Sequence, residues 1–416
     1  MIKPLRLNKK IKSFDKKIII DGDKSLSIRW ALLASQANGK SRAYKLLKSE
    51  DVMSTLDCLK KLGVQIKLKK DYCEINGKGL NSYNYKNNLI LNAGNSGTLG
   101  RLLLGLLVHS KKKIKLIGDK SLSKRDFSRV TGPLEKFGAR FSYKTKNKLP
   151  LSILGTETPT PINYTENRGS AQCKSSVMLA ALNTSGETFV KAKKSRNHTE
   201  LLFKYLNIPI KIKKTKKFDY IKTKGKKEFR SFNYKIPSDI SSSAFFIVLT
   251  ALSKNSKLII QNVNINSSRT GILKILKMMG VKITLKNKKN YKGEKVADIL
   301  VKSANNLKAI NCPQHLNSSA IDEFLIIFLI AAKCKGISYF KDLSELNQKE
   351  SPRLNWGSKI LHLMGIKNDL TNGSIKIYGN PELKIKNLIK IKGYLKDHRV
   401  FMMSTIAALT FGGKWE

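Results

Sequence analysis

Hydrophobic residues gather along the chain in six short segments that are apolar on nearly every face. Each segment opens with small or polar residues and runs for about three to four helical turns, as buried helices of globular domains do. The segments begin about 70 to 80 residues apart, which indicates a repeated structural unit. They are DKSLSIRWALLAS from Asp23, NSGTLGRLLLGLL from Asn95, SAQCKSSVMLAAL from Ser170, SDISSSAFFIVLTAL from Ser238, IDEFLIIFLIAAK from Ile321 and KDHRVFMMSTIAAL from Lys396.

Between these segments runs a second, amphipathic helix pattern that ends in Gly or Asn and passes into a β-branched strand, as in STLDCLKKLGVQI. Both residue types adopt the left-handed conformation that ends a helix. The predicted stops are Gly63, Gly138, Asn207, Gly280 and Gly365. Five copies are present where six are expected, and the sixth would follow Glu416, so we expect the last unit to be incomplete.

Six units of this kind predict an α/β protein with two domains of three units each, in which the helices lie inside and the sheets around them. The length of 416 residues also favours two domains, because one hydrophobic core rarely fills so long a chain. The start of a buried helix offers unpaired N–H groups and a positive dipole end, so several converging starts form an anion site. Ser and Thr at such starts also fit simple helix caps.

Charged side chains occupy five of the six helix starts, where a cap alone would not need them. Guanidinium groups bind phosphate and carboxylate, and carboxylates and lysines can transfer protons. The pattern therefore predicts a site for small anionic substrates with ionisable groups beside it. The charged residues are Lys24 with Arg29, Arg101, Lys174, Asp322 with Glu323, and Asp397 and His398 with Arg399.

The charge balance raises one alternative, because 80 Lys and Arg against 29 Asp and Glu give a formal charge of +51. Such an excess is found in nucleic-acid-binding proteins. Here the lysines are spread over the whole length and aromatic residues do not recur beside them, which is more typical of solvated faces than of a base-stacking groove. We therefore expect no specific nucleic-acid partner.

Two further features restrict the class of protein. No apolar run approaches the roughly 18 residues of a membrane span, and the N-terminus has no secretory apolar stretch, so we expect a cytoplasmic protein without a membrane partner. The cysteines are scattered, without metal-site spacing, and are interpreted as buried thiols. They are Cys58, Cys73, Cys173, Cys312 and Cys334.

Ten motifs follow one another along nearly the whole chain: DGDKSLSIR, LNAGNSGTLGR, GDKSLSKRDFSRVTGPLEKFGA, GSAQCKSSVMLAALNTSG, SRNHTELL, IPSDISSSAFF, NINSSRTGILKILKMMG, IDEFLI, KESPRL and KDHRVFMM. In this order they resemble the signatures of the 5-enolpyruvylshikimate-3-phosphate (EPSP) synthase family. The resemblance implies a two-domain inside-out α/β barrel, in which each domain has three βαβαββ units around buried parallel helices. Residues 1–20 and 238–416 would form one domain and residues 21–237 the other, with the active site in the cleft between them.

The resemblance also implies a reaction, the transfer of the enolpyruvyl group of phosphoenolpyruvate to the 5-hydroxyl of shikimate 3-phosphate with release of phosphate. This transferase step belongs to the shikimate pathway to chorismate and the aromatic amino acids. Asp322 would take the proton of the 5-hydroxyl, while Glu350 and Lys24 would handle the proton at carbon 3. No metal or organic cofactor is implied, and we expect a monomer whose partners are the two substrates.

The same resemblance assigns the binding residues. Phosphoenolpyruvate would contact Lys24, Gly97, Arg125, Gln172, Arg353 and Arg399. Shikimate 3-phosphate would contact Lys24, Ser25, Arg29, Thr98, Ser170, Gln172, Arg196, Asp322 and Lys349. Gly97 also has a reason of its own, because a side chain there would crowd a ligand that rests on the helix start. Arg269 and Thr270 are expected to serve as a hinge and in packing rather than to contact a ligand. His398 is expected to have a structural or orienting role, and the alternatives are a hydrogen-bonded core residue or a cap partner.

Several positions depart from the family's pattern: Asp21, Ile28, Asp126, Asn197, Ser238 and Pro352. Asp126 puts a carboxylate next to Arg125 and is expected to weaken the contact of that arginine with an anion. A lysine that helps to bind phosphoenolpyruvate in many members would lie beyond Glu416.

Three alternatives stay open at this point. The first is the related enolpyruvyl transferase that acts on a UDP-amino sugar, although its usual loop cysteine is missing from SLSKRDFS. The second is a basic RNA-binding protein, and the third is a homologue that keeps the fold without turnover.

Overall fold

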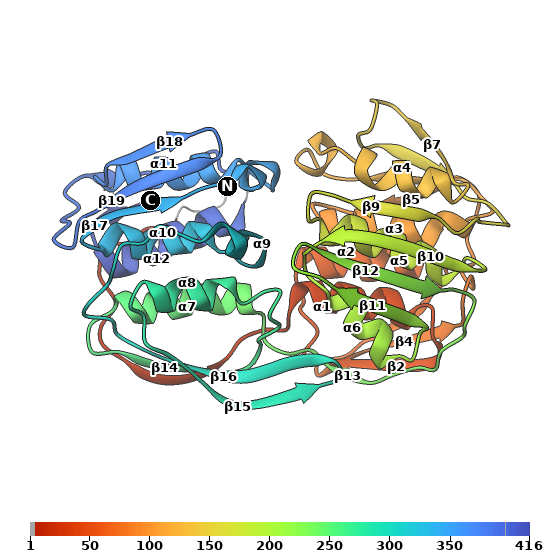
Figure 1. The fold of residues 1–416 in the computed structure, drawn as a ribbon, viewed down its shortest axis with the longest axis horizontal. Helices are drawn as coiled ribbons and strands as arrows, with labels where there is room; N and C mark the ends of the chain where they lie inside the picture. The colour runs from red at the N-terminus through yellow and green to blue at the C-terminus, as the bar shows by residue number, and fades with distance from the viewer. Residues whose placement is uncertain (1–4, 396) are drawn as a thin grey trace. The chain divides into compact units, whose positions relative to one another are not determined.

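The computed structural model describes residues 5–395 and 397–416, and its chain divides into two compact units (Figure 1). Unit 1 consists of Met1–Ile20, Ser238–Lys289 and Lys295–Glu416. Unit 2 consists of Asp21–Pro237 together with the short segment Asn290–Glu294. Lys396, where the sixth apolar pattern begins, lies outside the described residues.

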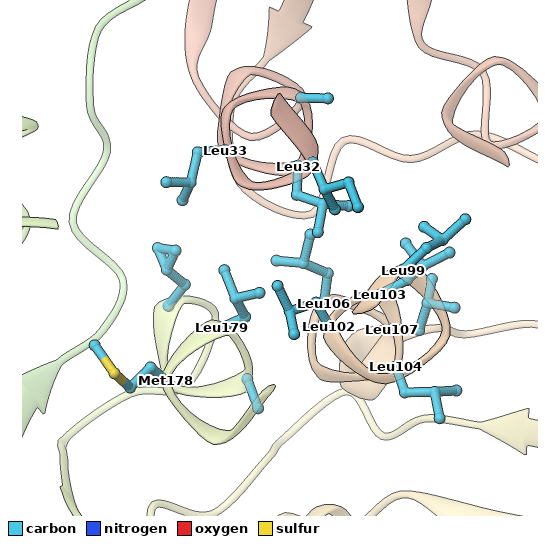
Figure 2. Packing of buried hydrophobic residues seen from close by; sticks show 14 of the residues in the cluster. Leu32, Leu33, Leu99, Leu102, Leu103, Leu104, Leu106, Leu107, Met178 and Leu179 are labelled. Carbon is cyan, nitrogen blue, oxygen red and sulfur yellow. The ribbon is translucent and has the colours of Figure 1, made fainter. Parts of the chain in front are cut away.

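Unit 2 is built around three buried helices, α1 (Lys24–Ala34), α3 (Gly97–Leu106) and α5 (Ala171–Leu182). The sequence predicts their burial because they are apolar on nearly every face, and α3 indeed contacts both α1 and α5. Figure 2 shows leucines of α1 and α3 meeting Met178 and Leu179 of α5 in one core. The amphipathic helices of this unit are α2 (Glu50–Lys61), α4 (Ser128–Lys136) and α6 (His198–Tyr205).

Three four-stranded sheets belong to unit 2, and each has one parallel pair followed by two antiparallel pairs. The first sheet has the order β13 (Tyr234–Lys235), β2 (Asn38–Tyr44), β4 (Tyr72–Lys78) and β3 (Gln65–Leu68). The second has the order β5 (Leu89–Asn92), β6 (Ile114–Ile117), β8 (Leu151–Leu154) and β7 (Arg140–Tyr143). The third has the order β9 (Asn163–Glu166), β10 (Glu187–Lys193), β12 (Phe218–Lys224) and β11 (Ile210–Lys214).

Unit 1 repeats the plan around α7 (Ile240–Leu252), α10 (Phe324–Lys333) and α12 (His398–Phe411), which contact one another in a second core. Its amphipathic helices are α8 (Gly271–Met278) and α11 (Arg353–Leu363), and α9 (Asn317–Ala320) is a single short turn. Its first sheet has the order β1 (Asp15–Ile19), β14 (Lys257–Asn264), β16 (Glu294–Lys302) and β15 (Ile283–Tyr291). The other two are β17 (Gly336–Phe340), β19 (Ser374–Gly379) and β18 (Asn368–Thr371), and the pair β20 (Leu388–Ile389) with β21 (Lys414–Trp415).

The predicted helix stops are confirmed by the backbone angles. Gly63, Gly138, Gly280 and Gly365 have φ between 86° and 105°, and Asn207 has φ of 55°. All five lie just beyond an amphipathic helix, in the left-handed region where Gly and Asn are tolerated best.

A second set of glycines packs against the C-terminal ends of the buried helices. Gly77, Gly155, Gly225 and Gly379 each lie at or directly after the end of an inner strand of a sheet, within its last two residues or the next one. A Cβ atom built on any of them would come within 2.1–2.5 Å of backbone atoms at, or just beyond, the end of a buried helix. These positions therefore need glycine for space, since the strand lies directly on the helix end.

The tip of the β15–β16 hairpin, Asn290–Glu294, packs entirely within unit 2. Glu294 Oε1 lies 2.6 Å from Nδ1 of His198, and both side chains are fully buried. The Tyr291 hydroxyl accepts the backbone N–H of Lys235 at 2.8 Å. Lys292 lies 5.4–5.9 Å from the ring centroids of Tyr205, Tyr234 and Tyr291. No motif or pattern in the sequence predicted that this tip belongs to unit 2.

Candidate active site

Short polar side chains cap the starts of five buried helices. Asp23, Ser96 and Ser170 accept backbone N–H groups of α1, α3 and α5, and Asp239 and Asp397 do the same for α7 and α12. The capping interpretation made for Ser is therefore correct at Ser96 and Ser170, while the other three caps are aspartates. One of these, Asp397, is a charge that the sequence had set apart from caps. The other charged residues at these helix starts make different contacts.

At the start of α1, Lys24 pairs with a residue that the sequence did not single out. Its Nζ lies 2.8 Å from Oδ2 of Asp51, in the first turn of α2, and both side chains are partly exposed. One turn later, Arg29 is buried and donates from Nη1 to the backbone oxygen of Ser25 at 3.1 Å. Its Nε donates to Oγ1 of Thr199, in the first turn of α6, at 2.9 Å. Arg29 is thereby held rigidly beside Ser25.

The start of α3 brings together four predicted ligand-binding residues and Arg101, which the sequence noted as a charge at this helix start. Arg101 Nη1 donates to Oε1 of Gln172 at 2.6 Å, and Nε2 of Gln172 donates to Oγ1 of Thr98 at 3.1 Å. A Cβ atom on Gly97 would lie 2.8 Å from Nη1 of Arg101 and 3.0 Å from Nη1 of Arg125. The guanidinium groups of both arginines therefore flank Gly97, which suits an anion that rests on this helix start.

Arg125 is held in place by Asn95, which precedes the cap of α3. Its Nη2 donates to Oδ1 of Asn95 at 2.9 Å. Its Nε is buried without a hydrogen-bond partner among the described residues. The neighbouring Asp126 accepts the backbone N–H of Ser128 at 2.6 Å, at the start of α4. The carboxylate that was expected to weaken Arg125 thus has a capping partner of its own.

The start of α5 requires a correction. Lys174, which the sequence grouped with the anion-binding charges, lies 2.6 Å from Oε1 of Glu200 in α6. Both side chains are buried, so this lysine is part of a structural ion pair inside unit 2. Ser170 caps α5 as described, and Arg196 is half-buried in the loop that precedes α6.

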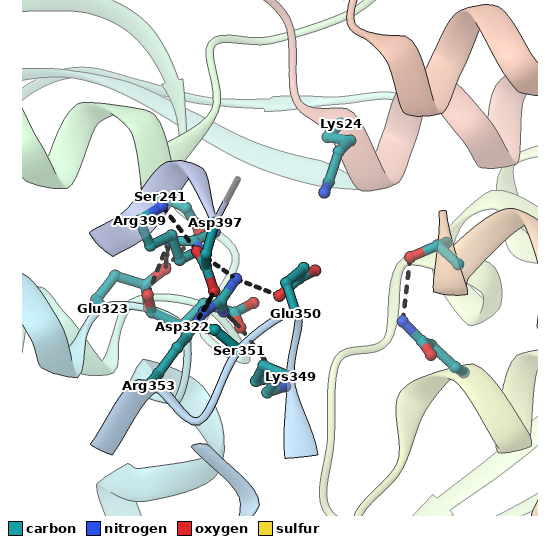
Figure 3. Close-up of polar contacts among 12 residues, drawn as sticks. Lys24, Ser241, Asp322, Glu323, Lys349, Glu350, Ser351, Arg353, Asp397 and Arg399 are labelled. Carbon is teal, nitrogen blue, oxygen red and sulfur yellow. Dashed lines mark hydrogen bonds and ion pairs between the residues drawn. The ribbon is translucent and has the colours of Figure 1, made fainter. Parts of the chain in front are cut away.

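In unit 1, five predicted residues meet around one guanidinium group (Figure 3). Arg353 donates from Nη1 to Oδ1 of Asp322 at 3.4 Å and from Nη2 to Oε2 of Glu350. Lys349 Nζ lies 3.5 Å from the same oxygen of Asp322. Arg399 Nη1 donates to the backbone oxygen of Asp322 at 2.8 Å. These contacts connect the segment before α10, the loop before α11 and the start of α12.

The carboxylate of Asp397 holds Arg353 and the start of α12 in place. This fully buried carboxylate accepts Nε of Arg353 at 2.9 Å, Oγ of Ser351 at 2.9 Å and the backbone N–H of Arg399 at 2.9 Å. Burial lowers the pKa of Arg353, but the charges of Glu350, Asp397 and Asp322 outweigh burial and raise the pKa above its ordinary value. Arg353 therefore keeps its positive charge at every relevant pH.

Behind this cluster lies a second buried network, which includes Arg269. Arg269 Nη2 donates to Oδ1 of Asp239 at 3.2 Å and to Oγ of Ser241 at 2.7 Å. Ser241 in turn donates to Oε1 of Glu323. Arg269 thus packs inside unit 1, as predicted.

His398 is exposed, so the interpretation of it as a core residue is wrong.

The prediction of buried thiols is confirmed, because all five cysteines are free and buried. Burial raises the pKa of Cys58, Cys73 and Cys334 to about 12 and that of Cys312 to about 11. Thiols with such pKa values are weak nucleophiles near neutral pH.

No helix among the described residues is long and apolar enough to cross a membrane.

Comparison with known proteins identifies the family. The sequence model described as EPSP synthase (3-phosphoshikimate 1-carboxyvinyltransferase) matches residues 8–415. The chain belongs to the EPSP synthase family. The 3-phosphoshikimate 1-carboxyvinyltransferase of Ruthia magnifica subsp. Calyptogena magnifica is 40% identical over 94% of this chain and 88% of the relative. That of Petrotoga mobilis is 38% identical over 94% of this chain and 90% of the relative.

Solved structures support the same fold. The structure of EPSP synthase from Acinetobacter baumannii has a TM-score of 0.85 and 33% identity, and covers 99% of this chain and 92% of that one. The enolpyruvyl transferase NikO from Streptomyces tendae has a TM-score of 0.75 at 12% identity, which shows likeness of fold alone. The resemblance drawn from the ten motifs, and the α/β fold expected from it, are confirmed.

Sequence reasoning missed several residues that hold the predicted ones. Asp51 and Asn95 touch residues with an assigned role. Arg101 touches Gln172, and Asp397 holds Arg353 and Arg399, although the sequence noted both only as charges at helix starts. Asn95 and Arg101 stood within a recognised motif, so their position next to Gly97 was the available signal. Asp51 gave none, because an acid in the first turn of an amphipathic helix is common.

Proposed function

We propose that this chain transfers the enolpyruvyl group of phosphoenolpyruvate to the 5-hydroxyl of shikimate 3-phosphate and releases inorganic phosphate. The observation that carries the proposal is the cluster of Asp322, Lys349, Glu350 and Arg353, which joins two carboxylates to two cations within one hydrogen-bonded group. Membership of the EPSP synthase family supports the same reaction.

We carry over to this chain the binding residues that the family resemblance implies. We assign phosphoenolpyruvate to the anion-binding group formed by Lys24, Gly97, Arg125, Gln172, Arg353 and Arg399. We assign shikimate 3-phosphate to Lys24, Ser25, Arg29, Thr98, Ser170, Gln172, Arg196, Asp322 and Lys349. Guanidinium forks and helix N-termini are suited to the phosphate and carboxylate groups of both molecules.

The chemical step proceeds by addition and then elimination. Asp322 takes the proton of the 5-hydroxyl as its oxygen attacks carbon 2 of phosphoenolpyruvate, while Glu350, assisted by Lys24, delivers a proton to carbon 3. The resulting tetrahedral ketal carries both the shikimate oxygen and the phosphate. Loss of the carbon 3 proton and departure of phosphate restore the double bond. Arg353 contacts both carboxylates and so orients the two proton-transferring groups toward one site.

The direct test measures phosphate release from phosphoenolpyruvate with and without shikimate 3-phosphate. We expect release only when both are present, and the organic product to be 5-enolpyruvylshikimate 3-phosphate. Release without the acceptor, or no release with both, would contradict the proposal. The second outcome would favour a homologue that keeps the fold without turnover.

The UDP-amino-sugar transferase remains a less favoured alternative. The cysteines of the described chain are buried with raised pKa values, whereas that enzyme class usually relies on a reactive loop cysteine. Substitution of a UDP-amino sugar for shikimate 3-phosphate in the assay distinguishes the two, and we expect no phosphate release with it.

The remaining properties follow from the same reaction. We propose a monomeric cytoplasmic enzyme that needs neither metal nor organic cofactor, because the proton transfers can be carried by its own carboxylates and lysine. Sedimentation measures the oligomeric state, and turnover in the presence of a chelator tests the metal requirement. A dimer, or activity lost to the chelator and restored by one metal, would contradict these two expectations.

A further inference from the structure

Glu166, at the end of β9, has no assigned role but makes a concentrated set of contacts. Its side chain is only 3% exposed. Oε1 accepts Nη2 of Arg129 in α4 at 3.2 Å and the backbone N–H of Arg168 at 3.2 Å. Oε2 accepts the backbone N–H of Ser170 at 2.8 Å. A buried carboxylate is costly unless it is paired, and this one has three N–H donors.

The loop that Glu166 holds leads directly into α5. Asn167 and Arg168 are exposed, and Gly169 has φ of 76°, so little else in the loop restrains its backbone. Glu166 is therefore the side chain that ties both ends of this short segment to the end of the β9 strand. Arg129 fixes the orientation of the carboxylate from a different helix.

The position of Ser170 matters for the ligand site that the proposed function assigns to α5. Ser170 is the cap of the helix, since its Oγ accepts the backbone N–H of Cys173 at 3.3 Å. Two residues later, Gln172 bonds Arg101 and Thr98 at the start of α3. A shift of the Ser170 backbone would displace both the Ser170 hydroxyl and the first turn that carries Gln172.

We propose that Glu166 is a positioning residue, which places Ser170 and the first turn of α5 for shikimate 3-phosphate through its bonds to two loop amides and Arg129. The inference rests on the proposed function. Glu166 touches no reacting atom in this role, so its loss changes how the acceptor binds and leaves the proton-transferring carboxylates of unit 1 unchanged.

The test compares kinetic constants of the full chain and of Glu166→Gln. Gln keeps the size of the side chain but replaces one carboxylate oxygen by an N–H group, which cannot accept the amide or the guanidinium. We expect the KM for shikimate 3-phosphate to rise about tenfold, as for loss of a charge-assisted hydrogen bond. The KM for phosphoenolpyruvate should rise by a smaller factor, because only Gln172 of its assigned residues lies in this turn, and kcat should change less than about twofold. Calorimetric titration with shikimate 3-phosphate alone should show the same loss of affinity.

The matched control is Glu187→Gln, on the neighbouring strand of the same sheet. Glu187 is half exposed and pairs with Lys222 at 2.9 Å on the surface, so all three constants should stay unchanged. If Glu166→Gln does not fold, Arg129→Gln replaces it, because that change leaves both amide contacts and should raise the same KM by a smaller factor. An unchanged KM for shikimate 3-phosphate in the variant that folds would overturn the inference. So would a fall in kcat and a rise in both KM values by the same factor. If the chain without any substitution releases no phosphate, the proposed function itself is contradicted.

Discussion

At the scale of single residues, charges at the helix starts are used in two ways. Lys174 and Glu200 neutralise each other inside unit 2, whereas Arg101 and Arg125 direct guanidinium groups at the space beside Gly97. The sequence could not separate these cases, because the deciding partner lies on another helix far along the chain. Glu200 is 26 residues beyond Lys174.

The role of Glu350 is open to a direct test by Glu350→Gln. The amide keeps a hydrogen bond to Arg353 but cannot exchange a proton with carbon 3, so we expect kcat to fall about 100-fold with little change in either KM. Steady-state kinetics measure all three constants. Glu345→Gln, an exposed acid in the same loop region, is the matched control and should retain full turnover. A parallel loss of substrate binding in Glu350→Gln would mark Glu350 as structural.

At the scale of helices and strands, the sequence predicted what local pattern determines. The six buried helices were found because their apolar residues leave no polar face, and the helix stops because Gly and Asn tolerate the left-handed backbone angles best. Contacts such as Glu166 with Arg129, or Asp397 with Arg353, depend on how distant segments pack. No local pattern encodes them, so they could not be derived from sequence.

The glycines that close the helix ends predict a sharp steric effect for Gly225→Ala. The added Cβ would lie 2.1 Å from the backbone oxygens of both Ala181 and Thr184, so strand or helix must move. We expect the free energy of unfolding to fall by about 1–3 kcal/mol, measured by urea denaturation. Gly132→Ala, inside α4, has nothing within 4 Å of its Cβ and should be neutral or stabilising by up to about 1 kcal/mol. Equal stability of the two variants would refute the close contact.

The partly buried His109, just beyond the end of α3, predicts a pH dependence of the free energy of unfolding. Burial, with a smaller contribution from Lys226, lowers the pKa of His109 to about 4. Between about pH 6.5 and 4 the unfolded chain binds a proton that the folded chain does not, so stability is lost as the pH falls through this range.

Thermal unfolding at several pH values measures this contribution. Removal of the imidazole in His109→Asn should reduce the fall in the unfolding temperature between pH 7 and 4.5. The exposed His315 offers the control, since His315→Asn should leave the fall unchanged. The same pH dependence in all three proteins would show that His109 contributes nothing.

At the scale of the whole molecule, the charge of +51 leads to a prediction about nucleic acid. Lysines spread over the surface attract any polyanion without a shaped groove. We therefore expect weak RNA binding that is independent of sequence and falls steeply between about 50 and 200 mM salt. Filter binding or fluorescence anisotropy with two unrelated RNAs provides the measurement. Tight binding of one RNA that persists at the higher salt would support the nucleic-acid alternative instead.

The hairpin tip Asn290–Glu294 has a consequence for any attempt to dissect this protein. Because this short segment belongs to unit 2, cutting the chain only after residues 20 and 237 does not yield two autonomous halves. A fragment of residues 21–237 would lose the carboxylate that meets the buried ring of His198, and the tyrosine that receives the Lys235 amide. A fragment of unit 2 that keeps these contacts must therefore include the five residues of the tip, joined to it by a linker.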